Sequence, residues 1–394
     1  MRGNFYANLD NTIESLKKAG TYKTLQHLFS PMSNKVIVEG CDNAIVLCSN
    51  NYLGLSNKPE IINAGIEALQ KYGAGAASVR HICGTFEIHR ILEDKIASFL
   101  NTEASLTYTS CFDANIAVIQ AILNSGDTVI SDELNHASII DGCRLTGHDV
   151  RKLVYKHANL RSLEEKLSES ANSETVLMVT DGVFSMEGDI APMPGIIDLA
   201  NKYNAIVMVD DSHSTGVIGK TGKGTTEHYN MTNKPDIISG TFGKALGGAG
   251  GGFIAGKRSL IDLLIQKSRP HIFSNALPPV VAGISAAAID YLVANPQIIS
   301  SLHNKVIYMH KALKRKDLYP MLGDSAILPL IIGDTAKAIK MADEMLKKGV
   351  LIRGFGYPVV PEGKARLRIQ VSDSLSYSDI DYSVQAIKDV YDHI

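Results

Sequence analysis

The chain has 394 residues, of which 45% are hydrophobic and 20% charged, and its formal net charge is −2. This charge argues against nucleic-acid binding, and no apolar run approaches the ~18 residues that a membrane span needs. The N-terminus lacks an apolar signal core, and the five cysteines show no CxxC spacing. We therefore expect a cytoplasmic protein without a disulfide framework or a metal site, and with no nucleic-acid or membrane partner.

Three segments are predicted in chain order. Residues 1–48 form an N-terminal helix and arm that end in a short strand. Residues 49–280 alternate short apolar runs with segments of helical period, and the predicted strands are 105–108, 128–131, 176–180, 205–209 and 237–240. Continuous Val, Ile and Met runs between helices are typical of a mostly parallel sheet with helices on both faces, so this segment is predicted to be a large α/β domain.

Residues 281–394 change to a smaller α+β pattern. A helix is expected around Met341 and Met345, ended by Gly349, and another begins near Ser378. Residues 365–372 alternate as a strand, with Arg368 on its polar side. That side is either a solvated sheet face or, alternatively, a guanidinium clamp for a substrate carboxylate.

Lys244 is the most informative residue, because it follows an apolar run and is surrounded by glycine and small residues. Burial lowers the pKa of a lysine and makes its neutral amine available near pH ~7. Such an amine can form a Schiff base with an aldehyde. Asp210, at the end of the preceding predicted strand, supplies a buried carboxylate. A lysine and a carboxylate at two strand ends of one sheet suit pyridoxal 5'-phosphate, which needs an amine for its aldehyde and an acid for its ring nitrogen.

Other polar residues could complete this site. The segment that includes Cys111 and Phe112 is expected to open a helix, whose free N–H groups would hold a phosphate. Thr241 and the pair Ser274-Asn275 could add donors. His136 lies in a polar turn and could stack on the cofactor ring. A run of glycines after Lys244 matches neither a dinucleotide fingerprint in the right context nor a Walker motif, which makes a nicotinamide or flavin enzyme improbable.

Several motifs together resemble the α-oxoamine synthase family of fold-type I PLP-dependent enzymes, along nearly the whole chain. They are SNNYLGL (49–55), NHAS (135–138), DGVFSM (181–186), DDSH (210–213) and GTFGKALGG (240–248). The resemblance implies an aspartate aminotransferase-like fold and the condensation of an amino acid with an acyl-CoA. Four further stretches resemble the members that join glycine to acetyl-CoA: ASVRHICGT (77–85), SCFDAN (110–115), SRPHIFSN (268–275) and YPVVP (357–361). Run in reverse, that reaction cleaves the product of threonine oxidation.

The resemblance also implies a role for each candidate. Lys244 would carry the cofactor and shuttle the substrate's α-proton, Asp210 would hold the pyridinium proton, and His136 would stack on the ring. His213 and Ser185 would contact the phenolic oxygen of the cofactor. Its phosphate would be bound by Cys111, Phe112 and Thr241, together with Ser274 and Asn275 from a second subunit. The substrate would be held by Asn50, His136, Ser185 and Arg368. A homodimer with shared active sites is therefore expected.

Two alternatives stay open. A sister activity of the family would use alanine and a long acyl thioester, or would make 5-aminolevulinate. A catalytically silent subunit would be expected to lack the lysine, but Lys244, Asp210 and His136 are all present.

Overall fold

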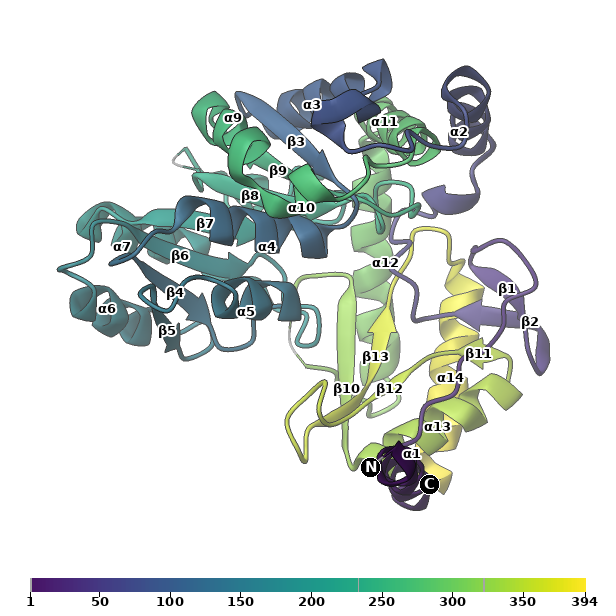
Figure 1. Cartoon of the computed structure of the whole chain (residues 1–394). Helices are drawn as coiled ribbons and strands as arrows, with labels where there is room; N and C mark the ends of the chain where they lie inside the picture. Colours follow the sequence, from purple (N-terminus) through teal and green to yellow (C-terminus); the bar gives the residue numbers. More distant parts are fainter. Residues whose placement is uncertain (1, 233, 322) are drawn as a thin grey trace. The chain divides into compact units, whose positions relative to one another are not determined.

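The computed structural model describes residues 2–232, 234–321 and 323–394, and it divides into two compact units (Figure 1). Unit 1 holds the residues up to Ser49, the segment Met186–Gly188 and the residues from His303 onward. Unit 2 holds Asn50–Ser185 and Asp189–Leu302. The N-terminal segment thus belongs to the same unit as the C-terminal one. The predicted division into three domains, residues 1–48, 49–280 and 281–394, stays a prediction.

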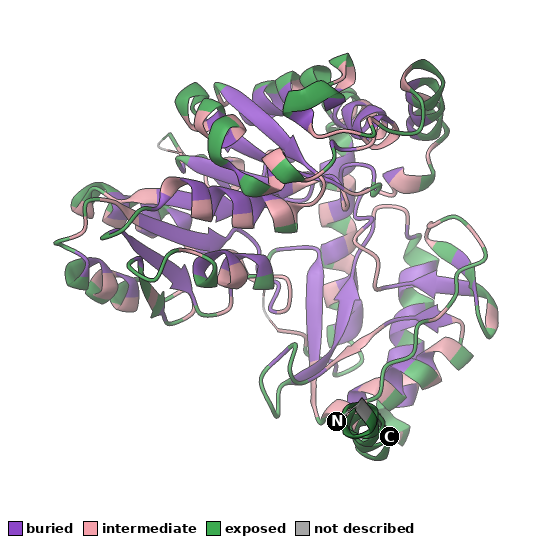
Figure 2. Cartoon of the chain, in the orientation of Figure 1, coloured by how far each residue is buried: buried purple, intermediate pink, exposed green. Residues whose placement is uncertain are grey.

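A seven-stranded sheet forms the centre of unit 2, in the order β3-β9-β8-β7-β6-β4-β5. Its strands are β3 (Ala104–Tyr108), β4 (Thr128–Asp132), β5 (Arg151–Tyr155), β6 (Val176–Asp181), β7 (Ile206–Asp210), β8 (Ile237–Thr241) and β9 (Gly252–Gly256). Every pairing is parallel except the two that β9 makes with β3 and β8. Figure 2 shows the inner strands buried along their length. The predicted mostly parallel sheet is confirmed.

Two strands, β5 and β9, were not among the five predicted ones. β5 lies at the sheet edge and begins with the exposed, charged residues Arg151 and Lys152, a composition that protects edge strands from unwanted pairing. β9 follows the glycine run and packs closely on β8. A Cβ on Gly240 would lie 2.4 Å from the ring of Phe253, so this approach requires glycine.

Helices connect the strands of unit 2. They are α2 (Pro59–Tyr72), α3 (Glu87–Leu100), α4 (Cys111–Ile122), α5 (Ala137–Arg144), α6 (Leu160–Glu169), α7 (Met193–Tyr203), α8 (Thr225–His228), α9 (Arg258–Lys267), α10 (Arg269–Phe273) and α11 (Pro279–Ala294), with short helical turns η1 (Leu55–Asn57) and η2 (Arg80–Gly84). The central helix α4 packs its buried face, including Val118 and Ile119, against the apolar side chains of the sheet. This packing fixes the start of α4 beside the carboxyl end of β3.

Unit 1 contains two small sheets, ordered β1-β2-β11 and β10-β13-β12. Its elements are α1 (Arg2–Lys18), β1 (Lys35–Val38), β2 (Cys41–Val46), β10 (Ile327–Gly333), α13 (Thr335–Lys347), β11 (Val350–Leu351), β12 (Gly354–Phe355), β13 (Ala365–Gln370) and α14 (Tyr377–His393); α12 (Gln297–Lys314) runs through the Leu302/His303 boundary. Among the described residues no single helix has the length and hydropathy of a membrane span, and α11 and α12 pass that test only as a pair bent by 84°.

The polar side of β13 is buried, so the alternative of a solvated sheet face is wrong. Arg366 is 3% exposed and Arg368 is 7% exposed. Arg366 Nη1 donates to Glu187 Oε1 at 3.0 Å and to the Met186 carbonyl at 2.8 Å. The guanidinium of Arg368 lies 4.7 Å from the centre of the Phe355 ring. Buried polar groups are usually hydrogen-bonded or paired, as Arg366 is here, whereas the Nε of Arg368 has no hydrogen-bond partner among the described residues.

Candidate active site

A cavity of about 230 Å³ opens at the carboxyl ends of the parallel strands of unit 2. Loops that follow β3, β4, β6, β7 and β8 each contribute to its wall. Its lining residues are Ser110, Cys111, Phe112, His136, Ser138, Asp181, Val183, Asp210, Ser212, His213, Thr241 and Lys244. Open α/β sheets place their ligands at this edge, so the cavity is the candidate active site.

Asp210 ends β7 and is 5% exposed. Its Oδ1 accepts the backbone N–H of Ser212 at 2.9 Å, and its Oδ2 accepts the side-chain N–H of Asn115 at 2.6 Å. The thiol of Cys111 lies 3.9 Å from Oδ2. Three neighbouring groups thus hold the carboxylate in one orientation at the cavity wall.

Lys244 lies in the turn after β8 and lines the same cavity as Asp210. Its side chain is half-buried, rather than fully enclosed as the small neighbours had suggested. Thr241, at the end of β8, donates its hydroxyl hydrogen to the Gly251 carbonyl at 2.9 Å and accepts the N–H of Gly243 at 3.0 Å. A phosphate donor role for Thr241 would therefore require its hydroxyl hydrogen to leave Gly251.

The start of α4 faces the cavity through Cys111 and Phe112. Ser110 caps this helix, because its Oγ accepts the N–H of Asp113 at 3.0 Å. The N–H groups of the first turn have no carbonyl partner within the helix, and the helix dipole adds positive potential there. Burial, and next the charge of Asp210, raise the pKa of the Cys111 thiol well above its ordinary value, so this thiol is not a nucleophile.

His136 stands at the start of α5, accessible from the cavity side. Its Nδ1 lies 2.7 Å from Ser138 Oγ. Desolvation by the protein packed around the ring lowers the pKa of His136, which favours the neutral imidazole. The Phe112 ring meets His136 edge-on, with centroids 6.3 Å apart.

His213 is buried in the loop after β7 and contacts a residue that we did not place in the site from the sequence. The hydroxyl of Tyr52 lies 2.8 Å from His213 Nδ1, and Tyr52 is fully buried. The SNNYLGL motif contains Tyr52, so the motif was the available signal. Its side-chain contact was visible only in the folded chain.

A second carboxyl, Asp181, also lines the cavity and was not among the predicted site residues. It ends β6 directly opposite Asp210 in the strand register. Burial, and then the charge of Asp210, raise the pKa of Asp181 well above its ordinary value, which favours its protonated form. The position of Asp181 at the end of a predicted strand could have identified it from the sequence, because Asp210 was identified from such a position.

Five predicted site residues are not among those that line this cavity. Arg368 belongs to unit 1, and Ser185 and Asn50 lie at the ends of unit 2 segments. Ser274 and Asn275 follow α10, where Asn275 is exposed and forms a bridge to Val79. Their roles stay predictions.

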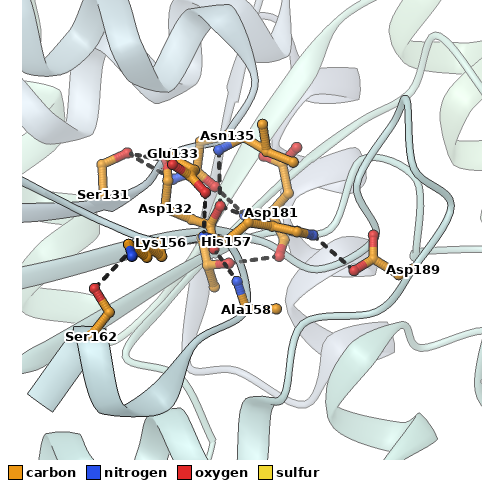
Figure 3. A network of polar contacts seen from close by, with 12 residues as sticks. Ser131, Asp132, Glu133, Asn135, Lys156, His157, Ala158, Ser162, Asp181 and Asp189 are labelled. Carbon is orange, nitrogen blue, oxygen red and sulfur yellow. Dashed lines mark hydrogen bonds and ion pairs between the residues drawn. The ribbon is translucent and has the colours of Figure 1, made fainter. Parts of the chain in front are cut away.

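A polar network joins the segments that follow β4, β5 and β6 (Figure 3). Asn135 donates to the Val179 carbonyl at 2.8 Å and accepts the N–H of Asp181 at 2.8 Å, which joins the ends of β4 and β6. His157 lies between Asp132 and Asp189, with contacts of 3.1 and 2.9 Å. Desolvation lowers the pKa of His157, but hydrogen bonds to the two carboxylates outweigh it and raise the pKa to about 10.

The donor set fits pyridoxal phosphate. The cavity combines an amine (Lys244) and a buried, oriented carboxylate (Asp210) with a helix start that suits a phosphate. Gly252 makes this arrangement possible, since a Cβ there would lie 2.3 Å from the Cys111 nitrogen. The start of α4 can therefore lie against β9 only if this residue is glycine.

The fold and the site define a PLP-dependent transferase, and the chain belongs to the family of class I and II aminotransferases, whose model matches residues 42–387. The chain is 45% identical over 383 residues to 2-amino-3-ketobutyrate coenzyme A ligase, mitochondrial, of Bos taurus, covering 97% of this chain and 91% of the relative. It is 41% identical over 388 residues to 2-amino-3-ketobutyrate coenzyme A ligase of Escherichia coli, with 98% and 97% covered.

A third relative carries a different name. The chain is 45% identical over 379 residues to 8-amino-7-oxononanoate synthase of Thermoanaerobacter pseudethanolicus, covering 96% of this chain and 95% of the relative. Among solved structures, serine palmitoyltransferase of Sphingomonas wittichii matches with a TM-score of 0.91 at 28% identity, with 97% and 96% covered. A second one, serine palmitoyltransferase with PLP, has a TM-score of 0.93 at 27% identity and covers 99% of each chain.

Proposed function

We propose that the protein is a PLP-dependent acyltransferase that condenses glycine with acetyl-CoA to give 2-amino-3-ketobutyrate and CoA. In the reverse direction it cleaves 2-amino-3-ketobutyrate, the product of threonine oxidation, into glycine and acetyl-CoA. The observation that carries this proposal is one cavity that combines Lys244, Asp210 and the start of α4, in a chain 41% identical to the Escherichia coli ligase over nearly its whole length.

Five residues of the cavity have a task in this reaction. When bound, pyridoxal phosphate withdraws electrons from the α-carbon of the amino acid. Lys244 Nζ would hold the cofactor and, once released, take and return the proton at that carbon. Asp210 would face the ring nitrogen and keep its proton in place. The N–H groups of Cys111 and Phe112 would hold the phosphate, and His136 would cover one face of the ring.

The other predicted contacts belong to the same proposal. His213, oriented by Tyr52, and Ser185 would reach the phenolic oxygen of the cofactor. Asn50 and Arg368 would hold the substrate carboxylate, for which the planar guanidinium suits bidentate binding. Arg368 is well prepared for this task, since Phe355 stacks on it and Gln370 accepts from it at 3.2 Å.

A second candidate is 8-amino-7-oxononanoate synthase, which would use alanine and a long acyl thioester. The 45% identity to the Thermoanaerobacter relative supports it, because that identity equals the value for the bovine ligase. Overall identity therefore does not separate the two activities.

Substrate profiling of the cofactor-loaded protein tests the proposal. We expect release of CoA with glycine and acetyl-CoA, and much slower release with alanine and a pimeloyl thioester. Preference for the second pair would replace the proposed activity with the second candidate. Absence of thioester cleavage with every amino acid, together with a normal PLP absorption band, would contradict both.

We also propose a homodimer in which each chain completes the site of the other. Ser274 and Asn275 lie outside the cavity of their own chain. They are flanked by large exposed apolar side chains, Phe273 at 70% and Ile82 at 71% exposed. Such exposed apolar groups favour an interface between chains.

The cytoplasmic location stays a prediction, because the bovine relative is named as mitochondrial.

A further inference from the structure

Two buried side chains, Asn115 and Ser138, connect Asp210 with His136. Asn115 lies on α4 and Ser138 on α5, and both are 0% exposed. Asn115 Nδ2 lies 2.6 Å from Asp210 Oδ2 and 2.9 Å from Ser138 Oγ. Ser138 Oγ lies 2.7 Å from His136 Nδ1. The four side chains form one hydrogen-bonded series that ends at a cavity-lining group on either side.

The chemistry of these groups determines which atom donates at each step. A carboxylate only accepts, so the NH₂ of Asn115, rather than its oxygen, must face Asp210. The second hydrogen of the same NH₂ group goes to Ser138 Oγ. The opposite orientation would put Asn115 Oδ1 against a carboxylate oxygen at the same 2.6 Å, where the two would repel. The hydroxyl hydrogen of Ser138 is therefore available for His136 Nδ1.

A second contact on His136 Nδ1 agrees with this direction. The backbone N–H of Ser138 also donates to Nδ1, at 3.3 Å, in the N-cap of α5. A ring nitrogen that accepts from both a hydroxyl and an amide does not carry a hydrogen of its own. The imidazole hydrogen then lies on Nε2.

We propose that Asn115 and Ser138 are positioning residues that hold His136 as the neutral tautomer protonated at Nε2. In this form His136 would cover the cofactor ring with its one hydrogen on Nε2, and Nδ1 could not take a proton from the substrate. The tautomer follows from the contacts of this chain. Its importance for turnover rests on the proposed function.

The energetics of Asn115 also indicate a functional group. Its Oδ1 is buried and has no hydrogen-bond partner among the residues that the structure describes. An unsatisfied buried acceptor destabilises a fold, and an apolar side chain of similar shape would not incur that cost. The two donor contacts of the amide explain why a polar side chain occupies this position.

Nitrogen NMR of histidine tests the tautomer directly. The cofactor-loaded protein is labelled with ¹⁵N-histidine, and the His136 signal is assigned by its loss in His136→Gln. At about pH 7.5 we expect a pyridine-type shift for Nδ1 and a pyrrole-type shift for Nε2. A pyrrole-type shift at Nδ1, or at both nitrogens, would overturn the proposal without any variant of Asn115 or Ser138.

Variants then test the role of the series. Ser138→Ala should raise the population of the Nδ1-protonated tautomer and lower kcat about tenfold, the worth of one hydrogen bond, with little change in KM for acetyl-CoA. Ser138→Thr, which keeps the hydroxyl, should restore the wild-type spectrum. Asn115→Leu should shift the tautomer in the same direction as Ser138→Ala.

Ser170→Ala is the matched control, because Ser170 is also buried, does not line the cavity, and donates its hydroxyl hydrogen to the Lys166 carbonyl of α6. It should change neither the tautomer nor kcat. An unchanged His136 spectrum in both Ser138→Ala and Asn115→Leu would contradict the proposal. If the wild-type protein transfers no acetyl group, the proposed function fails, but the spectrum still decides the tautomer.

Discussion

Burial moves three groups of the cavity toward their uncharged forms. The pKa values of Asp181 and Cys111 are raised and that of His136 is lowered, each with desolvation as the largest cause. A proton-transfer site benefits from neutral walls, because few competing charges then surround the reacting atoms. Each pKa shift is a property of one residue, but the atoms that desolvate that residue come from segments distant in sequence.

Lys244→Ala tests the central residue. We expect turnover to fall by about 10³-fold or more, because the variant lacks the amine proposed to hold the cofactor and move the α-proton. Borohydride treatment followed by peptide mass analysis should find a PLP adduct at Lys244 in the wild type and none in the variant. Lys257→Ala, which removes an exposed lysine, is the control. Near-normal activity of Lys244→Ala would refute its assignment.

Gly252→Ala tests the contact that places the start of α4. The added Cβ would lie 2.3 Å from the nitrogen and 2.5 Å from the Cα of Cys111, so the helix start must move. We expect weaker PLP binding in an absorbance titration and a loss of about 1–3 kcal/mol in the free energy of unfolding. Gly147→Ala adds a methyl where no atom lies within 4 Å and should change neither quantity.

At the scale of elements, His157 connects three loops. It contacts Asp132 at the end of β4 and Asp189 (Figure 3). Its ring packs edge-on against Phe184, with centroids 4.4 Å apart. Phe184 and Asp189 belong to one tight loop, since the Phe184 N–H donates to the Asp189 carbonyl at 3.0 Å. A charged His157 therefore holds the loop that carries Ser185.

The pH dependence of stability checks this role. The pKa of His157 is raised from 6.5 to about 10 in the folded chain, so its stabilisation is complete below about pH 6.5 and is lost as the pH rises through 10. The facing charged groups are Asp132, Asp189 and Glu133, which accepts the His157 backbone N–H. His157→Gln should lower the free energy of unfolding by about 2–4 kcal/mol near pH 6.

Denaturant titrations of the wild type and His157→Gln should converge above about pH 10, where neither side chain is charged. His148→Gln removes an exposed histidine and serves as the control. A stability difference that stays constant from pH 6 to about 10 would show that the ion pair does not act as inferred.

At the scale of the whole molecule, shared active sites predict complementation between two inactive chains. Lys244→Ala lacks the amine, and an Asn275→Ala chain lacks a donor proposed to act in the partner's site. Mixed and refolded together, the two should form dimers with one intact site and recover activity that neither has alone. Asn275→Ala mixed with itself at the same concentration is the control. A monomer of 42.6 kDa in light scattering, active by itself, would contradict the dimer.

The sequence identified elements best where one physical signal dominated. Apolar runs predicted five strands of the large sheet, β3, β4, β6, β7 and β8, to within about one residue at each end, because strands buried on both faces need continuous apolar side chains. The charged edge strand β5 lacked that signal. The polar side of β13 could not be interpreted from alternation alone, because Glu187, whose carboxylate pairs with Arg366, is distant in sequence.

The sequence by itself determined the fold class and predicted the pair Lys244 and Asp210, since each follows an apolar run in a context that an ordinary surface residue does not have. Only the tertiary structure decided the surroundings of that pair. Tyr52, Asn115 and Asp181 reach the site through contacts between distant segments. The local sequence pattern indicates whether a side chain is buried. The hydrogen-bond partner of that side chain depends on packing between distant segments, and so does its protonation state.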